Sequence, residues 1–183
     1  MTPFVVYQGA WNVMERSFER EIIPMARSEG MALAPWNVLA AGKIRTDEEE
    51  EKRRQTGENG RTLSNPTWER NEREKTVCKA LEKVAAEVGT KHITSGIYFF
   101  DWDIHRHWAN VLFKVAIAYL MQKTPYVFPI IGGRKVEHLL ANIEALEISL
   151  SSDQIKYLEN VVSFEPGFPT WIIVSRCVFF CLP

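Results

Sequence analysis

Residues 31–43 carry side chains that suit a flat ligand bearing phosphate. An apolar run ends at Pro35-Trp36, and a loop of small residues, 37–42, follows it. This pattern is typical of a buried parallel strand whose carboxyl end opens onto a ligand. The Trp36 indole offers a stacking face, and small residues let backbone N–H groups approach a phosphate. Taken alone, Trp36 fits a core position better, so both interpretations stand at this point.

Two other segments carry residues of the same kind. Gln8 is an amide on an otherwise apolar segment, 4–8, and a buried amide must find a hydrogen-bonding partner. The segment 126–131 has the pattern of another strand, and it ends at Gly132-Gly133-Arg134. Any strand-to-helix turn can use glycine, so the glycine pair alone does not specify a site.

Strands and helices alternate among the elements that would hold these residues. The pattern predicts strands at 4–8, 31–36 and 126–131, and helices at 17–27, 72–88, 115–123, 135–146 and 151–161. The apolar stripe of the second helix is Val77, Ala80, Leu81, Val84 and Val88. Ser17 is expected to cap the first helix, Gly89 to end the second, and Ser151 or Ser152 to cap the last. This alternation of strands and helices is typical of a parallel sheet or of part of a (β/α) barrel.

Residues 43–75 form the most polar part of the chain. Asp47 to Arg54 is a run of charges, and glycine and asparagine follow it at 57–60. We expect a solvated helix end and a long loop here. The alternative is a flap that closes over the ligand, since long loops at strand ends often cover active sites.

The composition argues against several classes of partner. The 183 residues are 46% hydrophobic and 25% charged, which suits one globular domain with a sizeable core. The formal net charge of −1 gives no basis for binding nucleic acid or an anionic membrane. Cys78, Cys177 and Cys181 form no disulfide or zinc framework, and the first residues lack a signal-peptide pattern. Since no apolar run reaches the ~18 residues that span a bilayer, we expect a soluble cytoplasmic protein.

Three motifs together resemble the aldo-keto reductases. They are Tyr7-Gln8-Gly9-Ala10-Trp11-Asn12, the stretch from Ala34-Pro35-Trp36 to Gly42-Lys43, and the stretch from Pro129 to Leu139. The match is to the fungal aryl-alcohol dehydrogenase and norsolorinic acid reductase branch, over 1–95 and 115–170. The resemblance implies an α/β fold, in which 1–170 form the C-terminal half of a (β/α)8 TIM barrel with parallel strands and flanking helices. It also implies NADP(H) as cofactor and a small aromatic aldehyde, ketone or alcohol, or a polyketide carbonyl, as substrate.

The resemblance assigns cofactor contacts by position, and it favours the cofactor platform for Trp36. Gln8 corresponds to the residue whose amide holds the nicotinamide carboxamide, and Trp36 to the aromatic residue that stacks on the nicotinamide ring. The loop along the pyrophosphate corresponds to Asn37, Val38, Leu39, Ala40, Ala41 and Gly42. The stretch around the adenosine and its 2′-phosphate corresponds to Gly132, Gly133, Arg134, His138 and Asn142. An arginine and the first turn of a helix both suit a phosphate dianion.

No catalytic residue is assigned. The family's reaction uses an Asp, a Tyr acid, a Lys and a His, and no tyrosine of the chain occupies the matching motif. Those tyrosines are Tyr7, Tyr98, Tyr119, Tyr126 and Tyr157. Without an acid, hydride transfer to a carbonyl loses its main catalytic help. Two functions stay open: NADP-dependent hydride transfer, and an inactive remnant that at most binds NADPH or self-associates through open sheet edges.

Two segments depart from the family pattern. Residues 96–114 interrupt it as an insertion, and 171–183 form a divergent tail that is too short to span a bilayer. We hypothesise that 96–114 is translated intron sequence. Sequencing the transcripts of the gene tests this, and the absence of a shorter, spliced transcript would refute it. Asp101 to His107 has the alternating side chains of a metal site on a strand, but no partner ligand elsewhere, so no metal is predicted.

Overall fold

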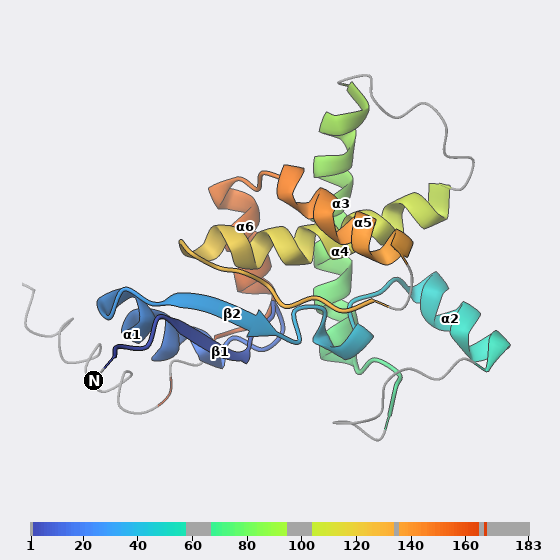
Figure 1. Cartoon of the computed structure of the whole chain (residues 1–183). Helices are drawn as coiled ribbons and strands as arrows, with labels where there is room; N and C mark the ends of the chain where they lie inside the picture. The colour runs from blue at the N-terminus through green and yellow to red at the C-terminus, as the bar shows by residue number, and fades with distance from the viewer. Residues whose placement is uncertain (1, 58–66, 95–103, 134–135, 165–166, 168–183) are drawn as a thin grey trace, which may run out of the picture.

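Two parallel strands lie side by side and form the sheet. The computed structural model describes residues 2–57, 67–94, 104–133, 136–164 and 167. Strand β1 (Val6–Ala10) pairs with β2 (Ala32–Trp36) in parallel, with Val6 opposite Ala32 and Ala10 opposite Trp36. Helix α1 (Ile22–Ser28) connects them (Figure 1). The predicted strand–helix–strand unit is therefore confirmed, although β1 begins two residues later than expected.

The segment 126–131 extends along the other edge of β2, but the prediction of a regular strand there is wrong. The Val127 position bridges Leu33 in parallel, and Phe128 N–H donates to the Leu33 carbonyl oxygen at 2.8 Å. Ile130 N–H donates to the Pro35 carbonyl oxygen at 2.8 Å. Pro35 has no N–H to donate to the Phe128 carbonyl oxygen, so the ladder stays incomplete. The spatial order is thus β1, β2 and then this irregular third segment.

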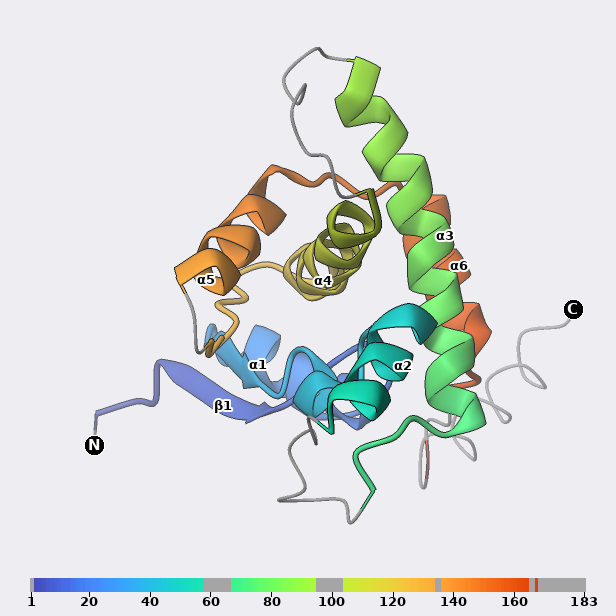
Figure 2. The same ribbon diagram turned by 90° about the vertical axis from the view of Figure 1, so that its right-hand side faces the viewer.

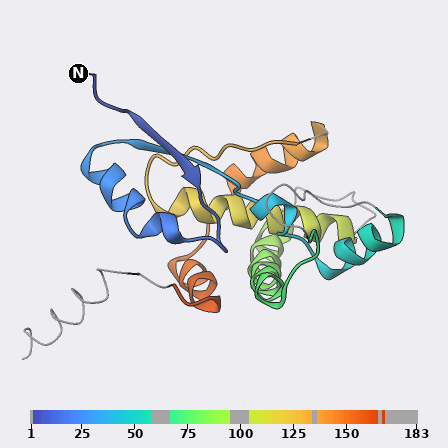
Figure 3. The same ribbon diagram turned by 90° about the horizontal axis from the view of Figure 1, so that it is seen from below.

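Helices surround the strands on several sides. They are α2 (Asp47–Thr56), α3 (Glu72–Thr94), α4 (Ile104–Lys123), α5 (Val136–Ile143) and α6 (Ser152–Val161), with short 3-10 helices at Ser17–Glu19, Ala40–Gly42 and Glu144–Glu147. Helix α4 packs against α3 and α5, and α3 packs against α6. Figure 2 shows β1 and α5 on one side of the molecule and α3 and α6 on the other. Helices α1 and α2 lie at opposite ends of the molecule (Figures 1 and 3).

Several predicted helix boundaries are wrong. The predicted cap Ser17 begins a separate 3-10 helix instead, and α1 starts only at Ile22. Helix α3 continues past Gly89 to Thr94, because burial of its apolar stripe outweighs the modest helix penalty of glycine. Helix α4 begins at residue 104 where 115 was predicted, and α5 ends at residue 143 and passes into a 3-10 helix.

The core lies between the sheet and the helices α3 and α4. All five residues of the predicted stripe of α3 are buried, together with most of α4 from residue 111 to 120. Under β1, the rings of Trp11 and Phe18 stack with centroids 5.5 Å apart. Ser151 caps α6 through a capping box with Gln154, which confirms that predicted cap. The buried side chains of α3 and α4 thus form a large part of the core.

Candidate functional site

The structure gathers three loops at one edge of the sheet. Because β1, β2 and the third segment run parallel, the loops that follow them begin at the same edge. These loops are 11–16, 37–46 and 132–135, of which 134–135 lie outside the described residues. Ligands of open parallel sheets bind at the carboxyl ends of the strands. The candidate site is therefore this edge, where the predicted loop 37–42 and the predicted Gly132-Gly133 turn both start.

Gln8 and Trp36 share the exposed face of the sheet. Leu33 and Pro35 are buried against the helices, and strand residues alternate between faces. Gln8 pairs with Ala34, so its side chain lies on the opposite face from Leu33, together with that of Trp36. Gln8 is exposed and the Trp36 side chain is 48% exposed. An amide and an indole are thus available on one surface.

The loop that follows Trp36 is tightly wound and strained. Asn37, Ala40, Ala41 and Gly42 all have positive φ angles, of 59°, 49°, 53° and 85°. Ala40 N–H donates to the Asn37 carbonyl oxygen at 2.9 Å and so closes the first turn. A left-handed alanine costs roughly 1–2 kcal/mol, and burial of Val38 and Ala40 holds the loop in place. Strain of this kind is concentrated at functional sites.

The residues predicted around the adenosine lie on the third segment and on α5. Gly132, Gly133 and His138 are exposed, and Asn142 is half-buried. His138 and Asn142 are four residues apart and therefore lie on one face of α5. Arg134, the predicted phosphate ligand, lies outside the described residues.

Asn12 is a site residue that the sequence prediction missed. It is buried in the loop that follows β1, and its Nδ2 donates to the Asn37 carbonyl oxygen at 3.1 Å. Its Oδ1 accepts from the backbone N–H groups of Met14 and Glu15, both at 2.9 Å. The only feature of the sequence that pointed to Asn12 was its position at the end of the motif 7–12.

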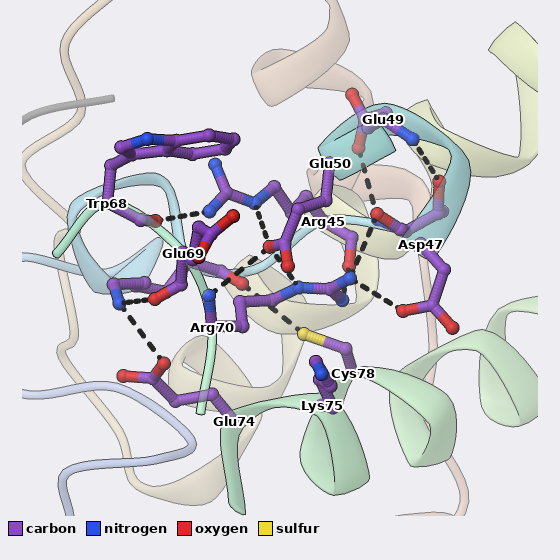
Figure 4. Close-up of polar contacts among 12 residues, drawn as sticks. Arg45, Asp47, Glu49, Glu50, Trp68, Glu69, Arg70, Glu74, Lys75 and Cys78 are labelled. Atoms are coloured by element: carbon purple, nitrogen blue, oxygen red, sulfur yellow. Dashed lines mark hydrogen bonds and ion pairs between the residues drawn. The ribbon is translucent and has the colours of Figure 1, made fainter. Parts of the chain in front are cut away.

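A buried charge network anchors the far end of the loop. Glu50 Oε2 accepts from Arg45 Nε at 2.9 Å and from Arg70 Nε at 2.8 Å (Figure 4). Arg70 also donates to Asp47 Oδ1 at 2.6 Å and to the Thr46 carbonyl oxygen at 3.2 Å. The prediction that this region is a solvated helix end is therefore wrong for Arg45, Glu50 and Arg70.

The network is ionised at neutral pH. Burial alone would raise the pKa of Glu50, but the hydrogen bonds and charges of Arg70 and Arg45 outweigh it and hold that pKa below its ordinary value. Lys43 is buried too, and its Nζ binds the Glu69 carbonyl oxygen and Glu74 Oε2. Lys43 and Arg45 therefore bind groups of α2, α3 and the segment 67–70, and hold these elements together.

A second buried cluster fixes the loop after β1. Glu19 accepts from Arg16 Nε at 2.9 Å, from Trp11 Nε1 at 3.3 Å and from the Tyr119 hydroxyl at 3.4 Å. Burial opposes ionisation of Glu19, but the Arg16 hydrogen bonds and charge lower its pKa below the ordinary value. Burial and the neighbouring Glu19 carboxylate raise the pKa of Tyr119. This cluster joins the loop to α4.

Other predicted features fall largely outside the described residues. Asp101 to Asp103, most of the first half of the predicted insertion and the 171–183 tail with both of its cysteines are not described. In the described part of the chain, no cluster of three or more His, Cys, Asp or Glu side chains could hold a metal ion. Over those same residues, no helix combines the length and apolar character needed to cross a bilayer. Cys78 is buried, and burial raises the pKa of its thiol.

Comparison with known proteins decides the family. The model of the aldo/keto reductase family matches residues 1–95 and 103–163. The chain belongs to the aldo/keto reductase family. It is 59% identical over 169 residues to an aryl-alcohol dehydrogenase (NADP(+)) of Phanerodontia chrysosporium. It is 43% identical over 166 residues to norsolorinic acid reductase B of Dothistroma septosporum. The family resemblance and its branch are thereby confirmed.

The chain spans less than half the length of these relatives. The two matches cover 92% and 91% of this chain, but only 39% and 36% of the respective relatives. A solved thermostable aldo-keto reductase bound to the inhibitor epalrestat matches with a TM-score of 0.53 and 21% identity. That match covers 88% of this chain and 41% of the other. The fold of parallel strands flanked by helices is thus consistent with part of an aldo-keto reductase barrel.

Proposed function

We propose that this chain binds NADP(H) and forms the cofactor-binding part of an oxidoreductase. The observation that carries the proposal is the pairing of Gln8 and Trp36 on one exposed sheet face, next to a strained loop at the carboxyl edge. The substrate we propose is an aryl alcohol, an aromatic aldehyde or ketone, or a polyketide carbonyl. The proposed place of action is the cytoplasm.

The side chains present fit a dinucleotide. The Trp36 indole is half-exposed and can stack on a nicotinamide ring, and Gln8 has an amide that can pair with a carboxamide. The loop 37–42 begins at the same edge of the sheet, and its small residues Ala41 and Gly42 would let backbone groups approach a pyrophosphate. Gly132 has no atom within 4 Å of an added Cβ, so this turn is open to a ligand.

NADPH, when bound, supplies a hydride to the substrate carbonyl. The role of this chain's residues is to bind and orient: Gln8 fixes the carboxamide, and Trp36 covers one face of the ring and excludes water from it. Tyr119 does not serve as the proton donor, because it is buried in the core and burial raises its pKa. No proton donor is assigned among the described residues.

The decisive experiment is calorimetric titration of the purified chain with NADPH and with NADH. We expect saturable NADPH binding, weakened about fivefold or more by Trp36→Ala, since stacking of one ring is worth ~1–3 kcal/mol. Tyr157→Ala is the matched control, because Tyr157 is also a partly exposed aromatic residue but lies on α6, away from the site. Equal effects of the two substitutions, or no binding by folded wild-type protein, would refute the proposal.

The second candidate is self-association without catalysis, which the exposed apolar surface favours. Side chains that are 45% or more exposed lie on β1, the third segment and α5, and they include Val6, Phe128, Ile130, Val136, Leu139, Leu140 and Ile143. The four of them on α5 recur at a spacing of three or four residues and share one helix face, and exposed apolar side chains that cluster mark interaction surfaces. Sedimentation velocity tests this candidate: we expect concentration-dependent association that Leu139→Lys abolishes and Tyr157→Lys retains. A monomer at all concentrations would refute it.

A further inference from the structure

Asn12 links the two loops that carry the candidate nicotinamide and pyrophosphate contacts. The residue is 1% exposed, and its amide oxygen is fully used by the Met14 and Glu15 N–H groups of its own loop. Its Nδ2 crosses to the next loop and donates to the Asn37 carbonyl oxygen at 3.1 Å. One buried side chain thus shapes its own turn and holds the neighbouring one.

The carbonyl that Asn12 binds belongs to the first strained residue of the loop. Asn37 has φ of 59°, and its carbonyl oxygen also accepts from Ala40 N–H. One residue earlier, Trp11 N–H donates to the Trp36 carbonyl oxygen at 3.2 Å. Consecutive residues of the first loop therefore bind consecutive carbonyls of the second. Left-handed residues persist only where surrounding contacts hold them.

We propose that Asn12 is a positioning residue for the cofactor. It holds Trp36 and the loop 37–42 in the conformation that receives the nicotinamide and the pyrophosphate. This inference rests on the proposed function, because it assigns a role within the same site. Asn12 is buried and acts through Asn37, so its removal changes the loop and leaves the adenosine-binding stretch on α5 intact.

Asn12→Asp removes the donor to Asn37 and places a carboxylate oxygen against the Asn37 carbonyl oxygen. Aspartate keeps the size of the side chain and an acceptor for Met14 and Glu15, but it loses the donor to Asn37. The matched control is Asn71→Asp, since Asn71 is exposed and its Oδ1 accepts from Glu74 N–H at 2.8 Å, at the start of α3. Asn12→Ser, whose hydroxyl both donates and accepts, is measured alongside as a milder variant in case the aspartate form fails to fold.

Two measurements are made on each protein. The first is the affinity for NADPH and for 2′,5′-ADP, which probes the adenosine half alone. The second is amide hydrogen exchange over residues 36–43, with α4 as the internal reference. The exchange measurement reports on the loop whether or not a nucleotide binds.

We expect Asn12→Asp to weaken NADPH binding about tenfold or more, which corresponds to about 1.4 kcal/mol or more, because the hydrogen bond is lost and two acceptor oxygens then face each other. Affinity for 2′,5′-ADP stays the same, and exchange accelerates at 36–43 but not in α4. Equal weakening of both nucleotides, or unchanged exchange at 36–43, overturns the positioning role. Folded wild-type protein that binds neither nucleotide refutes the proposed function itself, and the exchange result then still decides whether Asn12 holds the loop.

Discussion

Removal of the Glu50 charge tests whether the buried network stabilises the fold. The Glu50 side chain is 6% exposed, and those of Arg45 and Arg70 are 2% and 1% exposed. A single oxygen, Oε2, accepts from both guanidinium groups and from the Arg70 backbone N–H at 3.3 Å. In Glu50→Gln the two buried cations lose their shared counter-charge while the volume of the side chain is kept.

The expected cost is about 3 kcal/mol of unfolding free energy. Breaking a buried ion pair costs ~3–5 kcal/mol, and the glutamine oxygen still accepts hydrogen bonds, so we expect the lower end. The control is Glu51→Gln, because Glu51 is one residue away but 51% exposed and paired with an equally exposed Arg54. An exposed pair is worth ~0–1 kcal/mol. The comparison isolates burial from the general effect of removing a negative charge from α2.

Equilibrium urea unfolding followed by far-ultraviolet circular dichroism measures both values. With a slope of ~2 kcal/mol/M, Glu50→Gln shifts the midpoint by about 1.5 M and Glu51→Gln by less than about 0.5 M. High salt reduces the small midpoint shift of Glu51→Gln and leaves the shift of Glu50→Gln unchanged, since salt screens buried ion pairs only weakly. Equal midpoints for the two variants would refute the argument that burial makes this network important.

The contribution of Glu50 to the free energy of unfolding depends on pH in a definite direction. The folded-state pKa of Glu50 is lowered, so its contribution is fully present above the unfolded-state pKa of about 4.3. This contribution is lost as the pH falls through the folded-state pKa of Glu50. The difference between wild type and Glu50→Gln is therefore constant from pH 7 to about pH 5 and shrinks in more acidic solution. A difference that grows on acidification would contradict this assignment.

Three further substitutions can be tested by the same urea unfolding. Gly9→Ala places a Cβ 2.7 Å from Phe18 Cε2, so we expect a loss of about 1–3 kcal/mol; unchanged stability would mean that the ring moves aside. Glu82→Gln stabilises the fold at pH 7 but not at pH 3, because burial and two acidic residues of α2 raise the pKa of Glu82; destabilisation at pH 7 would contradict this. Ser151→Ala removes the α6 cap and costs about 1 kcal/mol, and no loss would mean that α6 does not depend on it.

The sequence predicted those parts of the fold that depend on local pattern. The apolar spacing of α3 and the serine cap of α6 are properties of neighbouring residues, and both are confirmed. The parallel pairing of β1 and β2 follows from strand–helix–strand order and is also confirmed. The end of α3 was missed because Gly89 weakens a helix only locally, whereas the buried stripe from Val77 to Val88 stabilises the helix.

The candidate site was predicted only in part. Gln8 and Trp36 were found because an amide and an indole on apolar strands are unusual, and their roles in cofactor binding stay predictions. Asn12 was missed because its partner, Asn37, is distant in sequence, and no spacing rule connects two loops that follow different strands. Asp47 to Arg54 was taken for a solvated face because its composition alone does not show which charges are buried.

The sequence by itself determined the family, the helical stripes and the chemistry available to the site. Only the tertiary structure decided which polar groups are buried and which stay open. Glu50 lies in the core because two arginines from separate segments meet its carboxylate, whereas Trp36 stays half-exposed because no element covers its face of the sheet among the described residues. The physical reason is that burial depends on contacts between residues far apart in the chain, while helical and strand patterns depend on near neighbours.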